Sequence, residues 1–497
     1  MTSFPILRSA TCIAAVLSAS TAMADVTAAQ VWADWQQNLS IYGEDGLTIG
    51  SEVMTGDTLI VSDIVLTFSD STSNVTATMG DIAFSENADG TVSVAMAPSY
   101  DMVIAGNAGD TVNMQITQSG LDMVVSGTPA QMTYRISADQ YGVIIDQITD
   151  TDGQIIDAEI RMIANDMTGS YTAQTDDMRN VDFDISAATI DILADVKPPE
   201  TPGDYVTFSG QMSGLTTKGN LTMPTDPTTV DPAEIFSNGT QMTGSYGYDS
   251  AQYLFDARIE GETASGTATT GAGSVNATFS QTGISYGANV QSLDVAVQGA
   301  GVPFPIEVSM AEYGFGITLP VTKSDTPADF GLNINLTDLN VNDVIWMMAD
   351  PTGALPHDPV TMLLDISGKA KLFHDLSDPA FENADVPGEL NALTLNDLTL
   401  KLGGAELTGL GDFTFDNSDL ETFNGVPRPA GDLSLTLKGG NALIDGLVQM
   451  GVVPQDQAMM GRMMMGMFAT VTGEDELTSK VEINDQGHVI ANGQRIQ

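Results

Sequence analysis

The sequence predicts a mainly β protein: an extended, curved antiparallel sheet or a sandwich, with a few short helices packed on it. Apolar residues recur at every second position, as at Leu433, Leu435 and Leu437, and Gly- or Pro-rich stretches separate such runs. A period of two gives a strand one apolar and one polar face. Short reversals and the near absence of a helical period favour antiparallel neighbours.

Residues 1–24 have the pattern of a cleavable export signal. Arg8 precedes an apolar run from Ala10 to Ala19, and Ala22-Met23-Ala24 predicts cleavage after Ala24. Cys12 lies in that run, so the mature chain is expected to contain no cysteine. No later segment reaches ~18 consecutive apolar residues. We therefore expect a periplasmic protein without a transmembrane segment.

The chain is strongly acidic, with 65 Asp and Glu against 16 Lys and Arg, and a formal net charge of −49. Such a charge repels nucleic acid and anionic lipid headgroups, so nucleic acid is excluded as a partner. The carboxylates are scattered along the chain, which indicates an acidic solvated surface.

Residues 25–196 are predicted to form an N-terminal helix followed by an antiparallel β region. Thr27 is expected to cap a helix carrying Val31, Trp32, Trp35 and Leu39, which packs against the end of a sheet. Alternating runs then follow one another as far as Asp195, and the Pro-rich stretch Lys197–Gly203 marks a boundary.

A middle antiparallel β region is predicted over residues 204–322, with a turn of helix near 233–236. Its strands between Gly261 and Ser280 are rich in Gly, Ala, Ser and Thr, so they bury little and should belong to a broad sheet. Residues 330–497 form a sheet-plus-helix region. Its helices are predicted at Val341–Ala349 after Asn340, and at Ala442–Met450 after Asn441.

Searches for catalytic motifs find none, so the sequence predicts a non-enzymatic protein with no cofactor. His357, His374 and His488 lie in separate segments. Asp150, Asp152, Gly153 and Glu159 have part of the spacing of a calcium loop, but Ile148 occupies its first position and strand-like runs flank it. A hairpin turn is the simpler interpretation.

The segment from Met459 to Met467 is rich in methionine. Met460, Met463, Met464 and Met467 share one face of a predicted helix. Packing on the sheet is the first interpretation, contact with an apolar ligand the second, and a Cu(I) site built from thioethers the third.

Several short segments resemble a family of exported bacterial proteins, domain of unknown function 2125. They are Pro303-Phe304, Leu319-Pro320-Val321 with Ser324, Asp343–Trp346 leading to Asp350-Pro351, Leu355–Pro359, Gly487-His488-Val489 and Asn492-Gly493. The resemblance implies an exported β-rich protein and no particular activity. The Leu-Thr-Leu strands more loosely resemble AsmA-like envelope proteins, which implies lipid carriage along a grooved sheet.

Our leading hypothesis is a non-enzymatic periplasmic envelope protein that binds or carries a lipid or another hydrophobic ligand on an apolar sheet face. The negative charge argues against this unless that face is free of carboxylates. The alternative is a structural or partner-binding envelope protein with no small ligand, and a carboxylate-dependent hydrolase is the remote one.

Overall fold

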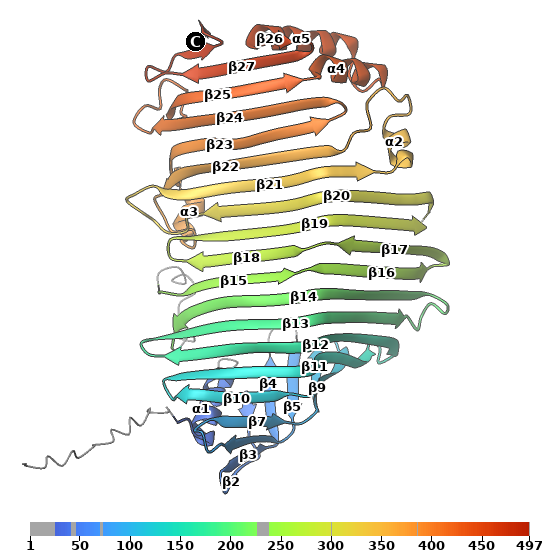
Figure 1. Cartoon of the computed structure of the whole chain (residues 1–497), viewed down its shortest axis with the longest axis vertical. Coiled ribbons are helices and arrows are strands. Elements are labelled where there is room, and N and C mark those ends of the chain that lie inside the picture. Colours follow the sequence, from blue (N-terminus) through green and yellow to red (C-terminus); the bar gives the residue numbers. More distant parts are fainter. Residues whose placement is uncertain are drawn as a thin grey trace, which may run out of the picture.

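The computed structural model describes residues 25–40, 46–69, 73–225, 238–299, 301–384 and 386–496. The predicted export signal, with its cleavage site after Ala24, and the turn of helix expected near 233–236 lie outside these ranges. Within them, 29 strands form one antiparallel sheet accompanied by five helices (Figure 1). The prediction of an extended, curved antiparallel sheet is confirmed.

The N-terminal strands form two branches that meet at β11, Gln131–Thr149. In the first branch, the first half of β11 pairs with β10, and the pairing continues in the order β10, β7, β6, β3 and β2. In the second branch, the second half of β11 pairs with β9, and the pairing continues in the order β9, β8, β5, β4 and β1. The bounds are β1 Leu47–Thr48, β2 Ser51–Thr55, β3 Thr58–Ser62, β4 Ile64–Ser69, β5 Ser73–Met79, β6 Ile82–Glu86, β7 Val92–Met96, β8 Ser99–Gly106, β9 Thr111–Ser119 and β10 Asp122–Thr128.

Beyond β11, most strands pair with their successor to make a tall ladder of long rungs (Figure 1), and at its end β25 and β26 both pair with β27. Two rungs are interrupted: β15 and β16 both pair with β14, and β17 and β18 both pair with β19. These strands are β12 Ile155–Thr175, β13 Met178–Lys197, β14 Tyr205–Pro224, β15 Gln241–Tyr248, β16 Ser250–Ile259, β17 Glu262–Thr270, β18 Gly273–Ser280 and β19 Gly283–Gly299. The Gly- and Ala-rich strands are thus part of a broad sheet, as predicted.

The C-terminal rungs continue this ladder. They are β20 Val302–Leu319, β21 Ala328–Val341, β22 Val360–Leu372, β23 Gly388–Leu402, β24 Ala405–Asp416, β25 Arg428–Lys438, β26 Thr470–Gly473, β27 Glu476–Ile483, β28 Val489–Ala491 and β29 Gln494–Arg495. The predicted boundaries at 197–203 and 323–329 fall near connections between paired neighbours, β13 with β14 and β20 with β21. The division into three regions stays a prediction.

A crease runs across the middle of the long strands. Asp166 in β12, Gly214 in β14, Ser292 in β19 and Asp338 in β21 all have positive φ, between 50° and 64°. The positions of the apolar residues shift by one across these residues. In β19 the apolar residues before Ser292, such as Tyr286 and Ala288, have even numbers, and those after it, such as Val295 and Val297, have odd numbers. A one-residue change of phase in a strand exchanges its two faces. The left-handed residue therefore keeps the apolar side chains of both halves on one side.

The closely packed core lies between the two N-terminal branches. It contains Phe84, Val61 and Ile64, which are almost inaccessible to solvent, and the helix α1, Ala28–Ser40. Trp32 and Trp35 of α1 pack on Phe84, with ring centroids 5.8 and 5.4 Å apart. The Thr27 hydroxyl accepts a hydrogen bond from the N–H of Gln30, so the predicted helix, its cap and its packing on the sheet are confirmed.

A buried polar network attaches α1 to the sheet. Arg179 of β13 is 3% exposed and its Nη2 lies 3.4 Å from Oδ1 of Asp34 in α1. The hydroxyl of Tyr134 donates to the other oxygen of Asp34 at 2.7 Å. Burial raises the pKa of Tyr134, which keeps this hydroxyl protonated. Removing one charge of a buried pair leaves the other uncompensated.

The remaining helices are short: α2 Asp343–Ala349, α3 Pro379–Asn383, α4 Gly440–Gln449 and α5 Gln455–Phe468. Two predicted caps are wrong. Asn340 belongs to β21 and Asn342 precedes α2, while Gly439 occupies the N-cap position of α4. The carboxylate of Asp475, 33 to 34 residues away, accepts the N–H groups of Asn441 and Ala442. A distant carboxylate thus replaces the expected local cap.

We predict that Asp34→Ala lowers the free energy of unfolding by about 3–5 kcal/mol, because it leaves the Arg179 guanidinium buried without its counter-charge. Urea unfolding followed by circular dichroism measures the change. The control is Glu159→Ala, which breaks the pair with Arg161 on the surface, where both side chains are more than half exposed. That change should cost at most about 1 kcal/mol. Equal effects of the two substitutions would contradict the assignment of the Asp34 pair as the attachment of α1.

Candidate functional site

Strand register aligns the apolar residues of successive rungs in rows that cross the whole sheet. Residues directly opposite each other in an antiparallel pair point to the same face. The row that starts at Tyr134 in the core runs through Tyr171, Phe183, Gly219, Gly244, Ala277, Tyr286, Ile317, Leu332, Ile366, Leu395, Gly411 and Leu433 to Val481. This row contains no charged residue.

Neighbouring rows on the same face have the same character. One contains Tyr248, Gly273, Val290, Tyr313, Leu336, Met362, Leu400, Leu407, Leu437 and Leu477; the next contains Thr217, Tyr246, Val275, Ala288, Phe315, Ile334, Leu364, Leu398, Gly409, Leu435 and Ser479. We call these three rows the inner face. From β14 to β27 they carry no Asp, Glu, Lys or Arg, although the chain contains 65 carboxylates.

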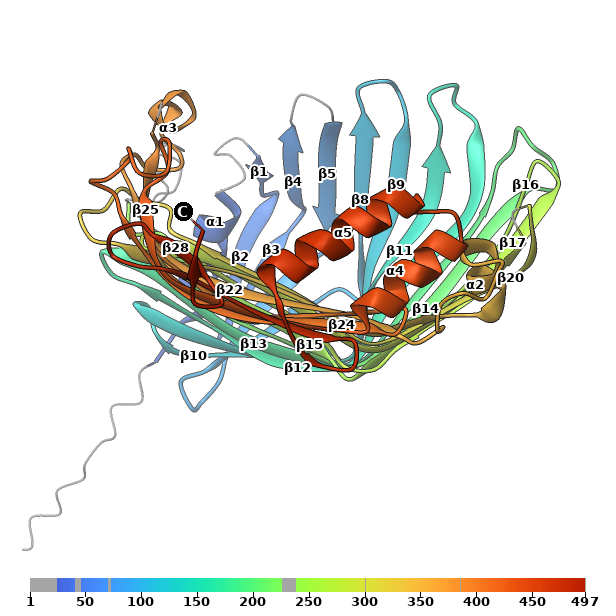
Figure 2. The ribbon, with the colours of Figure 1, turned by 90° about the horizontal axis from the view of Figure 1, so that it is seen from above.

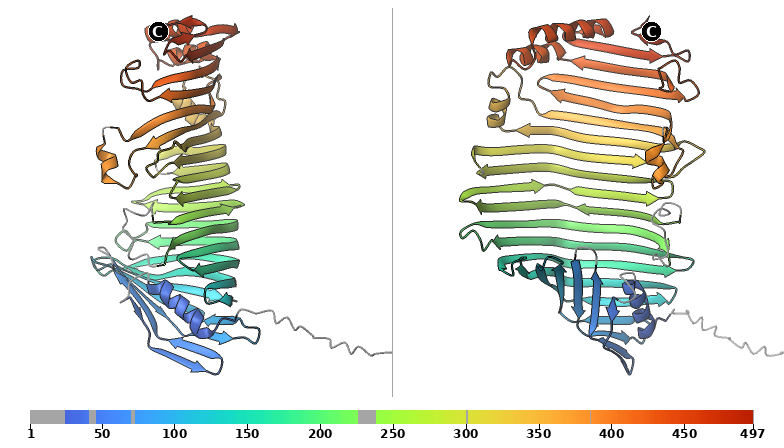
Figure 3. Two further views of the ribbon diagram at one scale, coloured as in Figure 1. Left: turned by 90° about the vertical axis from the view of Figure 1, so that its left-hand side faces the viewer. Right: turned by 180° about the vertical axis from the view of Figure 1, so that it is seen from behind.

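The inner face is the concave side of the sheet. Tyr134 belongs to it and contacts α1 through Asp34, and α1 lies inside the curve together with α4 and α5 (Figure 2). The two helices α4 and α5 lie at the C-terminal end of the ladder (Figures 1 and 3). Between α1 at one end and these helices at the other, the described helices α2 and α3 lie at the two edges of the ladder (Figure 1), and α2 contacts β20.

Solvent exposure shows that most of this face is uncovered. Tyr134 is 4% exposed inside the core, whereas Tyr286 and Tyr313 on the same face are each 45% exposed. Met362 and Leu400 are also exposed beyond a third of their surface. A contiguous exposed apolar surface is characteristic of a site that contacts another molecule.

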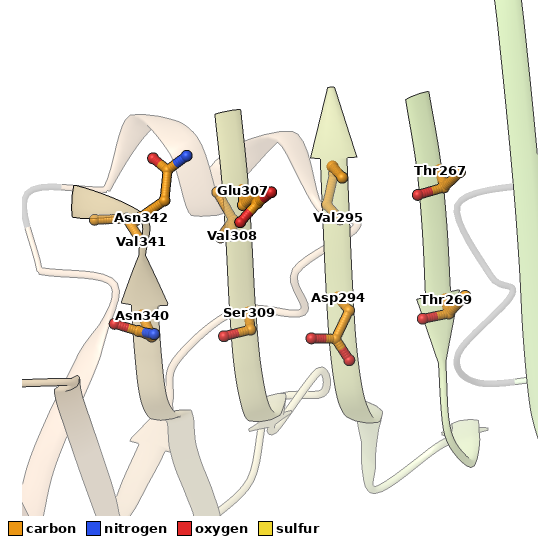
Figure 4. A pocket seen from close by; sticks show the side chains of 11 residues that line it. Thr267, Thr269, Asp294, Val295, Glu307, Val308, Ser309, Asn340, Val341 and Asn342 are labelled. Atoms are coloured by element: carbon orange, nitrogen blue, oxygen red, sulfur yellow. The ribbon is translucent and has the colours of Figure 1, made fainter. Parts of the chain in front are cut away.

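The opposite, outer face is polar. The row beside Tyr134 there contains Arg135, Ser170, Asp184, Lys218, Ser245 and Asn276, and Lys218 pairs with Asp184 at 3.0 Å. An open depression of about 290 Å³ lies among polar side chains of β17, β19, β20 and β21, including Thr269, Asp294, Glu307, Ser309 and Asn340 (Figure 4). No group of three His, Cys, Asp or Glu suited to holding a metal occurs among the described residues.

The structure also places the residues that the sequence singled out. Asp150 accepts the N–H groups of Asp152 and Gln154 in the turn between β11 and β12, so the interpretation as a hairpin turn is confirmed. The three histidines lie outside the strands, in the connection from α2 to β22, after β22 and before β28. Met460, Met463, Met464 and Met467 lie on α5 and are each more than half exposed. Their binding of Cu(I) stays an untested hypothesis.

A folded loop borders the inner face beside α4. The Asp350 carboxylate is buried and accepts hydrogen bonds from the N–H of Leu355 and from the N–H and hydroxyl of Thr352. The bond from Leu355 is the main reason that the pKa of Asp350 falls from 3.8 to about 2. In the same loop His357 stacks on Trp346, with ring centroids 4.7 Å apart. Leu355 in turn lies against Gly403 and Gly446.

Fold and site together define a single-layer antiparallel β protein with one apolar, charge-free and largely uncovered face. Residues 253–492 match the family described as "Uncharacterized protein conserved in bacteria (DUF2125)", which confirms the resemblance over this part of the chain. No curated protein and no solved structure matches the chain. The matched part includes the inner face from β18 to β27 and the helix α5. No described helix is long and apolar enough to cross a membrane.

We predict that Asp350→Ala increases hydrogen exchange of residues 350–359, because three hydrogen bonds that close the loop disappear. Exchange detected by mass spectrometry measures this. Asp358→Ala, in the same loop and solvent-exposed, should leave exchange unchanged. Since the pKa of Asp350 is depressed, its stabilisation of the loop is complete above about pH 4 and is lost as the pH falls through about 2. Equal exchange in both variants would show that the carboxylate does not hold the loop.

Proposed function

We propose that the protein binds the hydrocarbon chains of a lipid along the inner face and acts as a non-enzymatic lipid holder or carrier. One observation carries this proposal: the apolar rows from β14 to β27 are free of charge and exposed in a chain of net charge −49. Hydrocarbon is the ligand that gains most from such a surface, since each buried methylene contributes about 0.8 kcal/mol. The condition that the inner face be free of carboxylates is met.

The periplasm is the proposed compartment. The export pattern of residues 1–24 supports it. Val26, two residues beyond the predicted cleavage site, is buried, and its N–H donates to the carbonyl of Gly90. A chain cut after Ala24 would retain every contact of α1 described above.

A non-catalytic role is proposed together with lipid binding. The histidines lie on separate loops, and the carboxylates that have depressed pKa values, such as Asp350 and Asp416, accept hydrogen bonds that stabilise local turns. Groups of that kind are held in the ionised state and are poorly suited to proton transfer near neutral pH.

A second candidate function is docking of a partner protein without a small ligand. It is favoured by β2, which among the described strands pairs only with β3 and has all five residues exposed, including Val53 at 52%. An exposed strand edge with apolar side chains can accept a strand of another chain.

We predict that two carboxylates on the inner face weaken lipid binding. In Met362→Asp/Leu400→Asp both replaced side chains are already more than a third exposed, so the fold should persist while hydrocarbon would have to cover two charges. We expect the affinity for a fluorescent long-chain fatty acid to fall at least about ten-fold, a change of about 1.4 kcal/mol. Fluorescence titration and mass spectrometry of lipids retained from the native envelope provide the measurements.

The matched control is Leu410→Asp on the neighbouring strand. Leu410 lies opposite Ser434 on the outer face and is 59% exposed, so this substitution adds one carboxylate on the other side of the sheet, where the double variant adds two on the inner face. Its affinity should equal that of the wild type. Loss of binding in both variants, or no lipid bound by the wild-type protein, contradicts the proposal and favours partner docking.

A further inference from the structure

The end of the ladder beyond β25 carries an exposed apolar patch. It consists of Val452, Met459, Met460, Met463, Met464 and Met467, each between 52% and 66% exposed. All but Val452 lie on α5, whose single buried residue is Ala458. A helix in a folded protein normally buries an apolar stripe against its own core. The larger side chains of α5 instead face solvent, which indicates that they contact another molecule.

The patch is continuous with the inner face. Helix α5 packs on α4, and the start of α4 lies against Leu437, which belongs to the inner face. In Figure 2 both helices lie inside the curve of the sheet, at its C-terminal end. A molecule that contacts α5 is therefore placed beside the last rungs of the apolar rows.

Charge distinguishes this end from the rest of the molecule. Residues 440–471 contain two aspartates and one arginine, Asp445, Asp456 and Arg462. Arg462 donates to Asp445 at 2.6 Å and to the carbonyl of Asn441, so it offers no free cation to an anionic partner. The segment has a net charge of −1, whereas the whole chain has a formal net charge of −49. It therefore suits an uncharged apolar partner and not an anionic surface.

We propose that the α5 patch docks on the surface of a zwitterionic lipid bilayer, with its methionines in the outer acyl region, so that hydrocarbon chains pass between the bilayer and the inner face. This deepens the proposed function and rests on it. Flexible thioether side chains adapt to an irregular apolar surface, and the affinity of such a helix for a bilayer scales with the apolar area that it buries.

The test is cosedimentation of the full mature chain with phosphatidylcholine vesicles. In Met460→Gln/Met463→Gln/Met464→Gln/Met467→Gln we expect the vesicle-bound fraction to fall about ten-fold, because the apolar area is lost. Glutamine has nearly the same helix propensity as methionine, so α5 should persist. The control is Met54→Gln, an equally exposed methionine at the opposite end of the sheet, which should bind vesicles like the wild type.

Two further measurements separate this inference from the proposed function. The quadruple variant should keep its affinity for soluble fatty acid, whereas Met362→Asp/Leu400→Asp should lose that affinity and still bind vesicles. Vesicle binding that is unchanged in the quadruple variant, or that requires anionic lipid, overturns the inference. Dimerisation that the quadruple variant abolishes would also overturn it, because α5 would then contact a second copy of the chain.

Discussion

The structure depends on keeping the apolar side chains of each long strand on one face through the central crease. Asp166, Ser292 and Asp338 adopt a left-handed conformation there, which costs a non-Gly residue about 1 kcal/mol or more. Without the change of phase that accompanies it, the half of β12, β19 or β21 beyond the crease would turn its apolar residues toward the acidic side. The local cost thus maintains a continuous charge-free surface many strands long.

This arrangement divides the molecule into a closed end and an open ladder. At the closed end two branches and α1 bury Phe84, Ile64 and Tyr134 from solvent. Along the ladder the same face has no second layer, and Tyr286 and Tyr313 remain nearly half exposed. Backbone pairing and cross-strand contacts hold these rungs together. The exposed face is the surface that the proposed lipid ligand would contact.

Much of this could be predicted from the sequence, because local alternation is a direct record of burial. The strand around Leu435 and the helix carrying Trp32 were predicted from their own periodicity. The crease could not be predicted, since a serine at positive φ looks like any polar strand residue. The split at β11 could not be predicted either, because β11 is a single continuous strand whose two halves have different partners. The same holds for the cap that Asp475 supplies to α4 from 33 to 34 residues away. These features depend on contacts between distant segments.

The distribution of charge disfavours contacts between copies of the sheet that involve an outer face. Asp184, Lys218 and Asp365 lie on outer-face rows, while the inner-face rows from β14 to β27 contain no charge. Two acidic outer faces repel each other. An outer face placed against the inner face of another copy would bury carboxylates against apolar rows, which costs a large desolvation free energy. Flexible hydrocarbon chains meet neither obstacle, because they follow a concave surface and carry their polar groups at one end. The acidity that first argued against a lipid ligand therefore acts on the other side of the sheet, where it disfavours competing protein contacts.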